Sequence, residues 1–178
     1  MHRTALRIAA ASLGLVPTLA FAHPGHEGAG LVTGFLHPLG GVDHIIAMVA
    51  VGLLAARIGG RALWLVPASF VATMAVAGLG GMAGAPLPYA ETGIALSVVV
   101  LGAVAAFGVA MPVAVAMGLV AFFAVFHGYA HGIEMPETVS GLAYGAGFVA
   151  ATALLHGVGI GLGLLVGQIG RSSVRRAP

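Results

Sequence analysis

The sequence predicts an all-α protein, a polytopic bundle of about five transmembrane helices. Three observations support this fold: hydrophobic residues make up 60% of the 178 residues, charged residues make up only 7%, and the apolar residues form long runs. Soluble domains carry about 25% charged residues, so this chain has too few charges to cover a surface that faces water. Helices are expected because every backbone polar group inside lipid needs a hydrogen-bond partner within the protein.

The first 22 residues have the pattern of a cleaved signal peptide. Arg3 and Arg7 form a positive start, an apolar stretch follows, and Ala20-Phe21-Ala22 is a small-x-small cleavage signal. The apolar stretch is short for a spanning helix, which needs about 20 residues. We therefore expect cleavage after Ala22 and a mature chain, residues 23–178, that forms one transmembrane helical domain.

Five further hydrophobic segments are each long enough to cross a bilayer. They cover approximately residues 35–56, 62–82, 92–110, 112–130 and 141–167. If the mature N-terminus lies outside the cytoplasm, the arginines that follow the first span and the fifth span all fall inside. This distribution obeys the positive-inside rule and predicts a cytoplasmic C-terminus. The arginines therefore report topology, and the basic pI of about 9.7 is no indication of nucleic-acid binding.

Ionisable residues are rare in this chain, and the first span contains three of them. His37, Asp43 and His44 lie in the stretch His-Pro-Leu-Gly-Gly-Val-Asp-His. His37 and His44 are seven residues apart, so at 3.6 residues per turn they are expected to share one helix face. Gly40-Gly41 between them is expected to loosen the helix. Burying such groups in a membrane is costly, and they usually mark an ion or substrate path.

The fourth span ends in a second group, His127, His131 and Glu134. Spacings of four and three residues put these side chains on one helix face, and two imidazoles at i and i+4 commonly bind one metal ion. Both groups are expected in the outer half of the bilayer. Since the sequence has no cysteine, imidazole and carboxylate are the expected ligands. They suit Ni²⁺, Co²⁺, Zn²⁺ or Cu²⁺.

Four further residues are candidates for the same path. Glu91 starts the third span on the outer side, where a carboxylate is also favoured by the helix dipole. His23 and His26 at the mature N-terminus offer a first capture point for the ion, or belong to a disordered tail. His156, deeper in the fifth span, is either an exit ligand or a packing residue.

The two motifs closely resemble the signatures of the HupE/UreJ family of bacterial nickel and cobalt permeases. The resemblance extends to Arg61-Ala-Leu-Trp-Leu-Val-Pro67 and to Ala153-Leu-Leu-His-Gly-Val-Gly159. Family members usually continue beyond the arginine-rich segment into a further hydrophobic span, and the present sequence ends at Pro178. The resemblance implies a secondary transporter of the bacterial inner membrane that supplies metal for hydrogenase or urease maturation. The residues it implies as functional are His37, Asp43, His44, His127, His131 and Glu134.

Under this hypothesis the chain is not an enzyme, and it holds no permanent cofactor. Ni²⁺ or Co²⁺ is the transported ion, the partners are that ion and the lipid membrane, and the sequence leaves open whether the chain forms a homo-oligomer. Two other classes remain as alternatives. A membrane b-type cytochrome would use facing histidines, such as His44 and His127, as haem ligands. A His-box membrane metalloenzyme would use His127 and His131.

Overall fold

The computed structural model describes residues 30–135 and 140–174, and within them every regular element is an α-helix. The prediction of an all-α membrane bundle is confirmed. The signal-peptide prediction falls outside the described residues, as do His23 and His26. The helices are α2 (Gly30–Gly40), α3 (Val42–Ile58), α4 (Ala62–Met82), α5 (Ala90–Phe107), α6 (Val113–Ile133) and α7 (Gly141–Val174).

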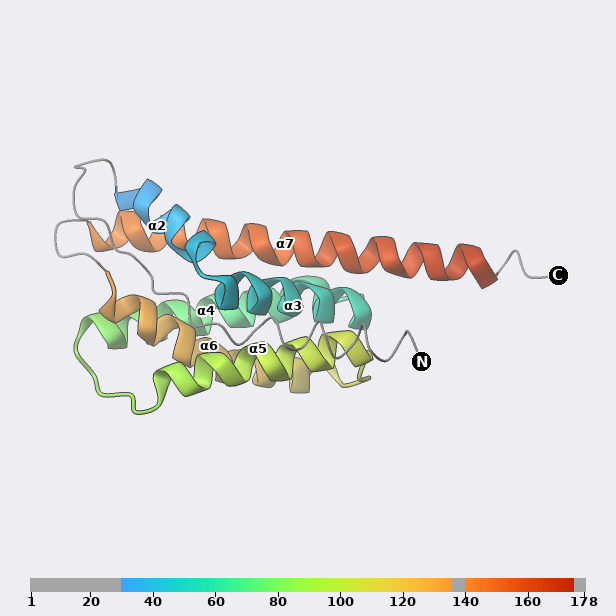
Figure 1. Cartoon of the computed structure of the whole chain (residues 1–178), viewed down its shortest axis with the longest axis horizontal. Helices are drawn as coiled ribbons and strands as arrows, with labels where there is room; N and C mark the ends of the chain where they lie inside the picture. The colour runs from blue at the N-terminus through green and yellow to red at the C-terminus, as the bar shows by residue number, and fades with distance from the viewer. Residues whose placement is uncertain (1–29, 136–139, 175–178) are drawn as a thin grey trace.

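Four of the described helices are long and apolar enough to cross a membrane on their own. These are α4, α5, α6 and the part of α7 between Gly141 and Gln168. The pair α2 and α3 is a fifth candidate span, bent by 86° at the break between the helices. Successive spans run in opposite directions, so α2, α5 and α7 begin at the end of the bundle where α4 and α6 finish (Figure 1).

The helix is interrupted at the expected weak point, Gly40-Gly41, but the expectation that His37 and His44 share one helix face was wrong. Gly41 has an extended backbone, with φ −101° and ψ 120°, and it separates α2 from α3. Glycine is a poor helix former, and Pro38 one turn earlier has no backbone N–H to donate. The two features explain why the chain leaves the helix here. His37 and His44 consequently lie on two differently directed helices and not on one helix face.

Glycine residues allow several helices to approach very closely. A Cβ atom at Gly128 would collide with the backbone of Met74, so α6 contacts α4 directly at this position. Gly52 and Gly159 meet in the same way between α3 and α7, where a Cβ at Gly52 would strike the carbonyl oxygen of His156. Such small-residue contacts are typical of helix pairs in membranes. They hold α3, α4, α6 and α7 close enough for side chains to meet in the centre.

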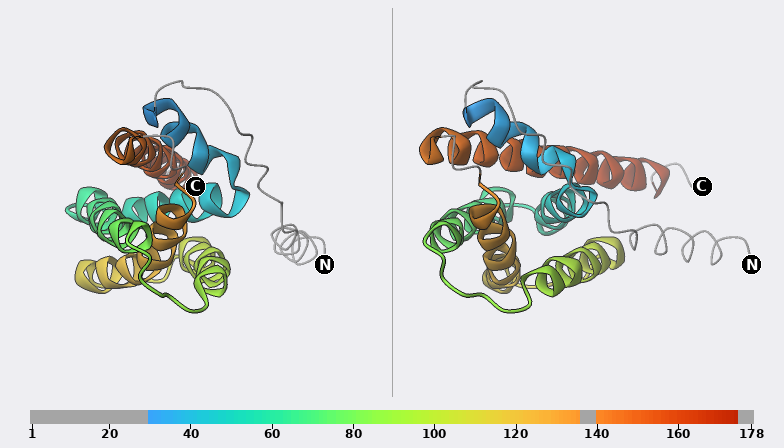
Figure 2. Two further views of the ribbon diagram at one scale, coloured as in Figure 1. Left: turned by 90° about the vertical axis from the view of Figure 1, so that its left-hand side faces the viewer. Right: turned by 60° about the vertical axis from the view of Figure 1, so that its left-hand side comes forward.

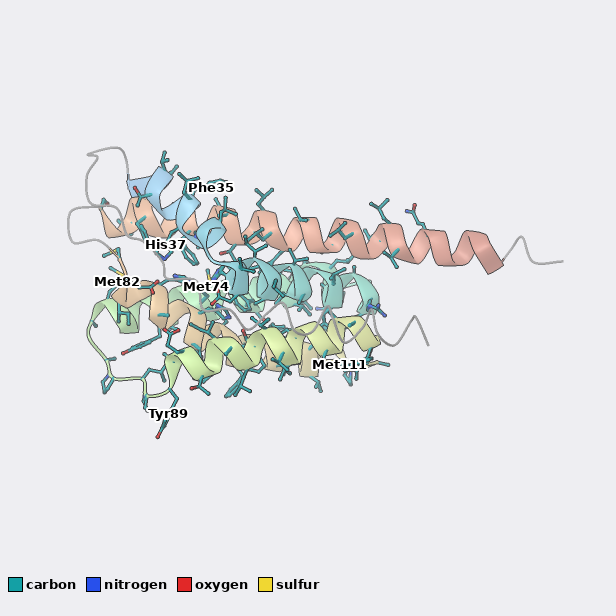
Figure 3. The ribbon with its side chains drawn as sticks, in the orientation of Figure 1. Phe35, His37, Met74, Met82, Tyr89 and Met111 are labelled. Atoms are coloured by element: carbon teal, nitrogen blue, oxygen red, sulfur yellow. The ribbon has the colours of Figure 1, made fainter. Side chains whose placement is uncertain are left out.

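The bundle has two chemically different ends. His37 lies at the same end as Met82 and Tyr89, whereas Met111 lies at the opposite end (Figure 3). Arg57 and Arg61 also lie at that opposite end, where α3 finishes and α4 begins. Viewed from the His37 end, α2 and α7 form one side of the bundle, α4, α5 and α6 form the other, and α3 lies between them (Figure 2).

Candidate metal centre

Two groups of ionisable side chains meet at the His37 end of the bundle, and they share one residue. The inner group consists of His44 from α3 with His127 and His131 from α6. The outer group consists of His37 from α2 with His131 and Glu134. In each group the three potential ligand atoms lie within 4.8 Å of one another. The bend at Gly41 brings both α2 and α3 to α6, and so makes the two groups adjacent.

The inner group combines two buried imidazoles, those of His44 and His127, with the partly buried imidazole of His131. His44 is 2% exposed and His127 is 0% exposed. The Nδ1 atom of His44 lies 3.2 Å from Nδ1 of His127 and 2.9 Å from Nε2 of His131. First-row metal ions bind imidazole nitrogen at about 2.0–2.1 Å, so two ligands of one ion are separated by about 2.9–3.4 Å at angles of about 90–109°. The His44–His127 and His44–His131 pairs are therefore spaced as two ligands of one such ion are.

The outer group is half-exposed and carries a negative charge. The Nε2 atom of His37 and the Nδ1 atom of His131 lie 3.1 Å and 3.2 Å from the same carboxylate oxygen, Oε2 of Glu134. Glu134 follows the last residue of α6, outside the membrane-spanning segment. The imidazole of His131, and secondly that of His37, lower the pKa of Glu134 to about 2. The carboxylate is thus ionised at every physiological pH and attracts a cation to this end of the bundle.

Ser97 on α5 orients the ring of His127, and no pattern in the sequence singles this serine out. Its hydroxyl lies 2.6 Å from the carbonyl oxygen of Ile94, to which it donates, and 2.7 Å from Nε2 of His127. Because the hydroxyl proton points to Ile94, the His127 ring donates its own Nε2–H to Ser97 Oγ. The lone pair of a neutral ring is then on Nδ1, the nitrogen that faces His44. Metal-binding histidines commonly have their second nitrogen fixed in this way.

Aromatic side chains surround the imidazoles. Phe148 on α7 contacts three of the rings, with centroid distances of 4.5 Å to His131, 5.3 Å to His44 and 6.3 Å to His37. Phe70 on α4 lies 5.9 Å from His127. Both phenylalanines are buried. These two apolar side chains help to exclude water from the inner group. Exclusion of water strengthens the electrostatic interaction between an ion and its ligands.

Comparison with known proteins identifies the family. The profile described as "HupE / UreJ protein" matches residues 11–177. The chain belongs to the HupE/UreJ family. It is also 47% identical over 163 residues to protein HupE of Rhizobium leguminosarum bv. viciae, an alignment that covers 91% of this chain and 85% of that protein. No solved structure gives a significant match.

Three other predicted residues of this HupE/UreJ protein, Asp43, Glu91 and His156, belong to neither of the two groups. Asp43 is exposed, and its carboxylate accepts a hydrogen bond of 2.8 Å from the backbone N–H of His44 at the start of α3. Glu91 lies in the first turn of α5, is exposed, and belongs to neither three-residue group of the described chain. His156 on α7 is buried, deeper than both groups. The carboxylates of Asp43 and Glu91 are near helix N-termini, where the dipole stabilises them.

The geometry of the inner group does not suit the haem alternative. The facing nitrogens of His44 and His127 are 3.2 Å apart, and the two ring centroids are 4.9 Å apart. A porphyrin would have to lie between these rings, and the third imidazole, from His131, points to the same place. The HupE/UreJ family is a transporter family, and this membership favours transport over either alternative.

Proposed function

We propose that this HupE/UreJ protein is a secondary permease for divalent nickel or cobalt, which it carries across the bacterial inner membrane for hydrogenase or urease maturation. The observation that supports this most strongly is the pair of overlapping groups, which lead from a half-exposed carboxylate to a buried set of three imidazoles. A hydrated cation must lose its water ligands before it can enter the membrane. A series of protein ligands from the surface inward lets each lost water be replaced in turn.

In this proposal the ion first meets His37 and Glu134 at the outer end of the bundle. His131 then passes it inward, since one of its nitrogens faces Glu134 and the other faces His44. The ion next lies among His44, His127 and His131. His23 and His26 remain a proposed first capture point, and Glu91 and Asp43 remain proposed contributors of negative charge near the entrance.

The proposed orientation places the mature N-terminus and the His37 end in the periplasm. Arg57 and Arg61 lie at the opposite end, and the positive-inside rule places that end in the cytoplasm. Reporter fusions test this directly. A periplasm-active reporter joined at the loop between α4 and α5 should be active, whereas the same reporter at Arg61 should be inactive. The reverse pattern would contradict the proposed direction of transport.

Uptake of radioactive nickel into bacteria that lack their own nickel transporters tests the function itself. Expression of the wild-type chain should raise uptake. His44→Ala or His127→Ala should lower it by about 100-fold, because each removes one of three ligands from a buried site. Ile46→Ala is the matched control, since Ile46 lies on α3 close to His44 and is 38% exposed. Wild-type uptake in both histidine variants would refute the proposed site.

Competition between metal ions in the uptake assay identifies the transported ion. Unlabelled Ni²⁺, Co²⁺ and Zn²⁺ are added in turn to the same uptake assay, over a range of concentrations. The proposal expects Ni²⁺ or Co²⁺ to displace the label at the lowest concentration. A clear preference for Zn²⁺ would support metal transport but contradict nickel or cobalt as the transported ion. Such a result is chemically possible because imidazole ligands alone do not discriminate among these borderline ions.

A further inference from the structure

His156 is a buried polar side chain that the proposed path has not used. It lies near the middle of the spanning part of α7, Gly141–Gln168, and is 1% exposed. Neither ring nitrogen, Nδ1 or Nε2, has a hydrogen-bond partner in the described chain. Burying an imidazole without such partners costs about 1–3 kcal/mol, so a purely structural role would be better served by an apolar residue.

The surroundings of His156 contain two further donor atoms. Thr152 lies one helical turn earlier on α7 and is fully buried. Its Oγ1 atom is 4.0 Å from the sulfur of Met74 on α4, and Met74 is also buried. Residues four positions apart share a helix face, so Thr152 with His156 on α7 faces Met74 with Phe70 on α4. An imidazole, a thioether and a hydroxyl therefore line the same contact between two helices.

This contact lies directly beyond the inner histidine group. The ring of Phe70 is 5.4 Å from His156 on one side and 5.9 Å from His127 on the other. Phe70 thus separates His156 from the three imidazoles by the width of a single ring. The rings of His37, His131, His44, His127, Phe70 and His156 form one continuous series, with each neighbouring pair of centroids 4.6–5.9 Å apart.

We propose that His156, with Met74 and Thr152, forms a second binding site for the transported divalent cation, halfway across the membrane and beyond Phe70. This inference rests on the proposed permease function and extends it. Imidazole and thioether both bind borderline first-row ions, and the hydroxyl adds a weak oxygen ligand. The second site has one imidazole where the inner group has three, so it should hold the ion more weakly. A weaker site after a stronger one allows the ion to be released toward the cytoplasm.

Binding measurements on the purified full-length protein in lipid nanodiscs test the second site. Co²⁺ is the probe, because its visible absorption reports its ligands. His156→Leu should bind one equivalent fewer than the wild-type protein, with the spectrum of the three-imidazole site retained. Leu155→Val is the matched control, since it alters the neighbouring buried side chain without removing a donor atom. Wild-type stoichiometry with an unchanged spectrum in His156→Leu would overturn the inference.

Transport kinetics provide the second measurement. His156→Leu should lower the maximal rate of nickel uptake by about tenfold and leave the half-saturating concentration within about twofold, because the outer ligands remain. His156→Met, which restores a donor atom, should recover part of the rate. If His156→Leu fails to fold, Met74→Leu combined with Thr152→Val removes the other two donors and should slow uptake likewise. An unchanged rate in the purifiable variant overturns the second site.

The outcomes separate this inference from the proposed function. Absence of nickel and cobalt uptake by the wild-type chain would remove the permease proposal and the second site with it. Wild-type uptake together with full activity of the His156 variants would leave the permease intact and remove only the second site.

Discussion

The α2–α3 pair and α6 bring histidines to the same place by different means. Helix α6 is continuous through its two histidines, and the spacing of four residues aligns His127 with His131. The α2–α3 pair is bent by 86° at Gly41, and its two histidines reach α6 from differently directed helices. A regular helix thus determines the relative positions of its histidines through local spacing alone. The ligands of a broken helix depend on what the two halves pack against.

The strongest test of this comparison disrupts the packing of α6. In Gly128→Val, the new side chain would collide with the backbone of Met74, which cannot give way by a change of rotamer. Overpacking of this kind costs about 1–3 kcal/mol, and we expect lower thermal stability in detergent and near-complete loss of nickel uptake. Gly118→Val on the same helix is the control, because a Cβ there meets no atom within 4 Å. Equal melting temperatures for the two variants would show that α6 does not depend on this contact.

A smaller effect on nickel uptake is expected from removing the hydrogen bond between Ser97 on α5 and His127 on α6. Ser97→Ala removes the acceptor that holds the Nε2–H of His127, so the ring loses its fixed tautomer and orientation. Loss of such a partner typically lowers metal affinity by about 10-fold, and the half-saturating nickel concentration should rise by that factor. Ser69→Ala is the control, because its hydroxyl contacts only the carbonyl oxygens of Val66 and Met117. An unchanged value for Ser97→Ala would mean that packing alone orients His127.

The smallest effect is expected at the bend itself. Alanine favours a helix over glycine by about 1 kcal/mol, so Gly41→Ala biases α2 and α3 toward a continuous helix. That change would draw His37 away from Glu134 and raise the half-saturating nickel concentration by about fivefold. Gly40→Ala is the matched control, since Gly40 is already helical and a Cβ there meets nothing within 4 Å. Equal uptake affinity in both variants would show that the bend is held entirely by packing.

The sequence predicted the all-helical bundle and the composition of the site better than its geometry. The apolar runs were long enough to define the helices, and the i, i+4 spacing correctly placed His127 and His131 on one face. The weak point at Gly40-Gly41 was predicted, but the direction of the bend was missed because low helix propensity indicates weakness and not direction. Ser97 and Phe148 were missed because a serine or a phenylalanine in an apolar helix carries no local signal. Their roles depend on which helices pack together.

The contacts of the Glu134 carboxylate become apparent only in the folded structure. In the sequence it is one turn beyond His131 and could be a ligand or a supporting group. In the structure its Oε2 atom contacts an imidazole from α2 and another from α6. The contact between α2 and α7 through Gly34 makes this possible, because it places His37 beside the end of α6. No spacing rule within the chain predicts a meeting of residues 97 positions apart.

His131 belongs to both groups, and under the proposed function this sharing limits how many ions the outer half of the protein holds at once. A neutral imidazole has a proton on one nitrogen and a lone pair on the other. When the lone pair of His131 is on Nε2, it serves the inner group, and when it is on Nδ1, it serves the outer group. A proton shift between the two nitrogens therefore transfers the ligand from one group to the next. Because the lone pair serves only one group at a time, the two groups would be occupied in succession. A second ion would bind in the outer group only after the first ion had left the inner group.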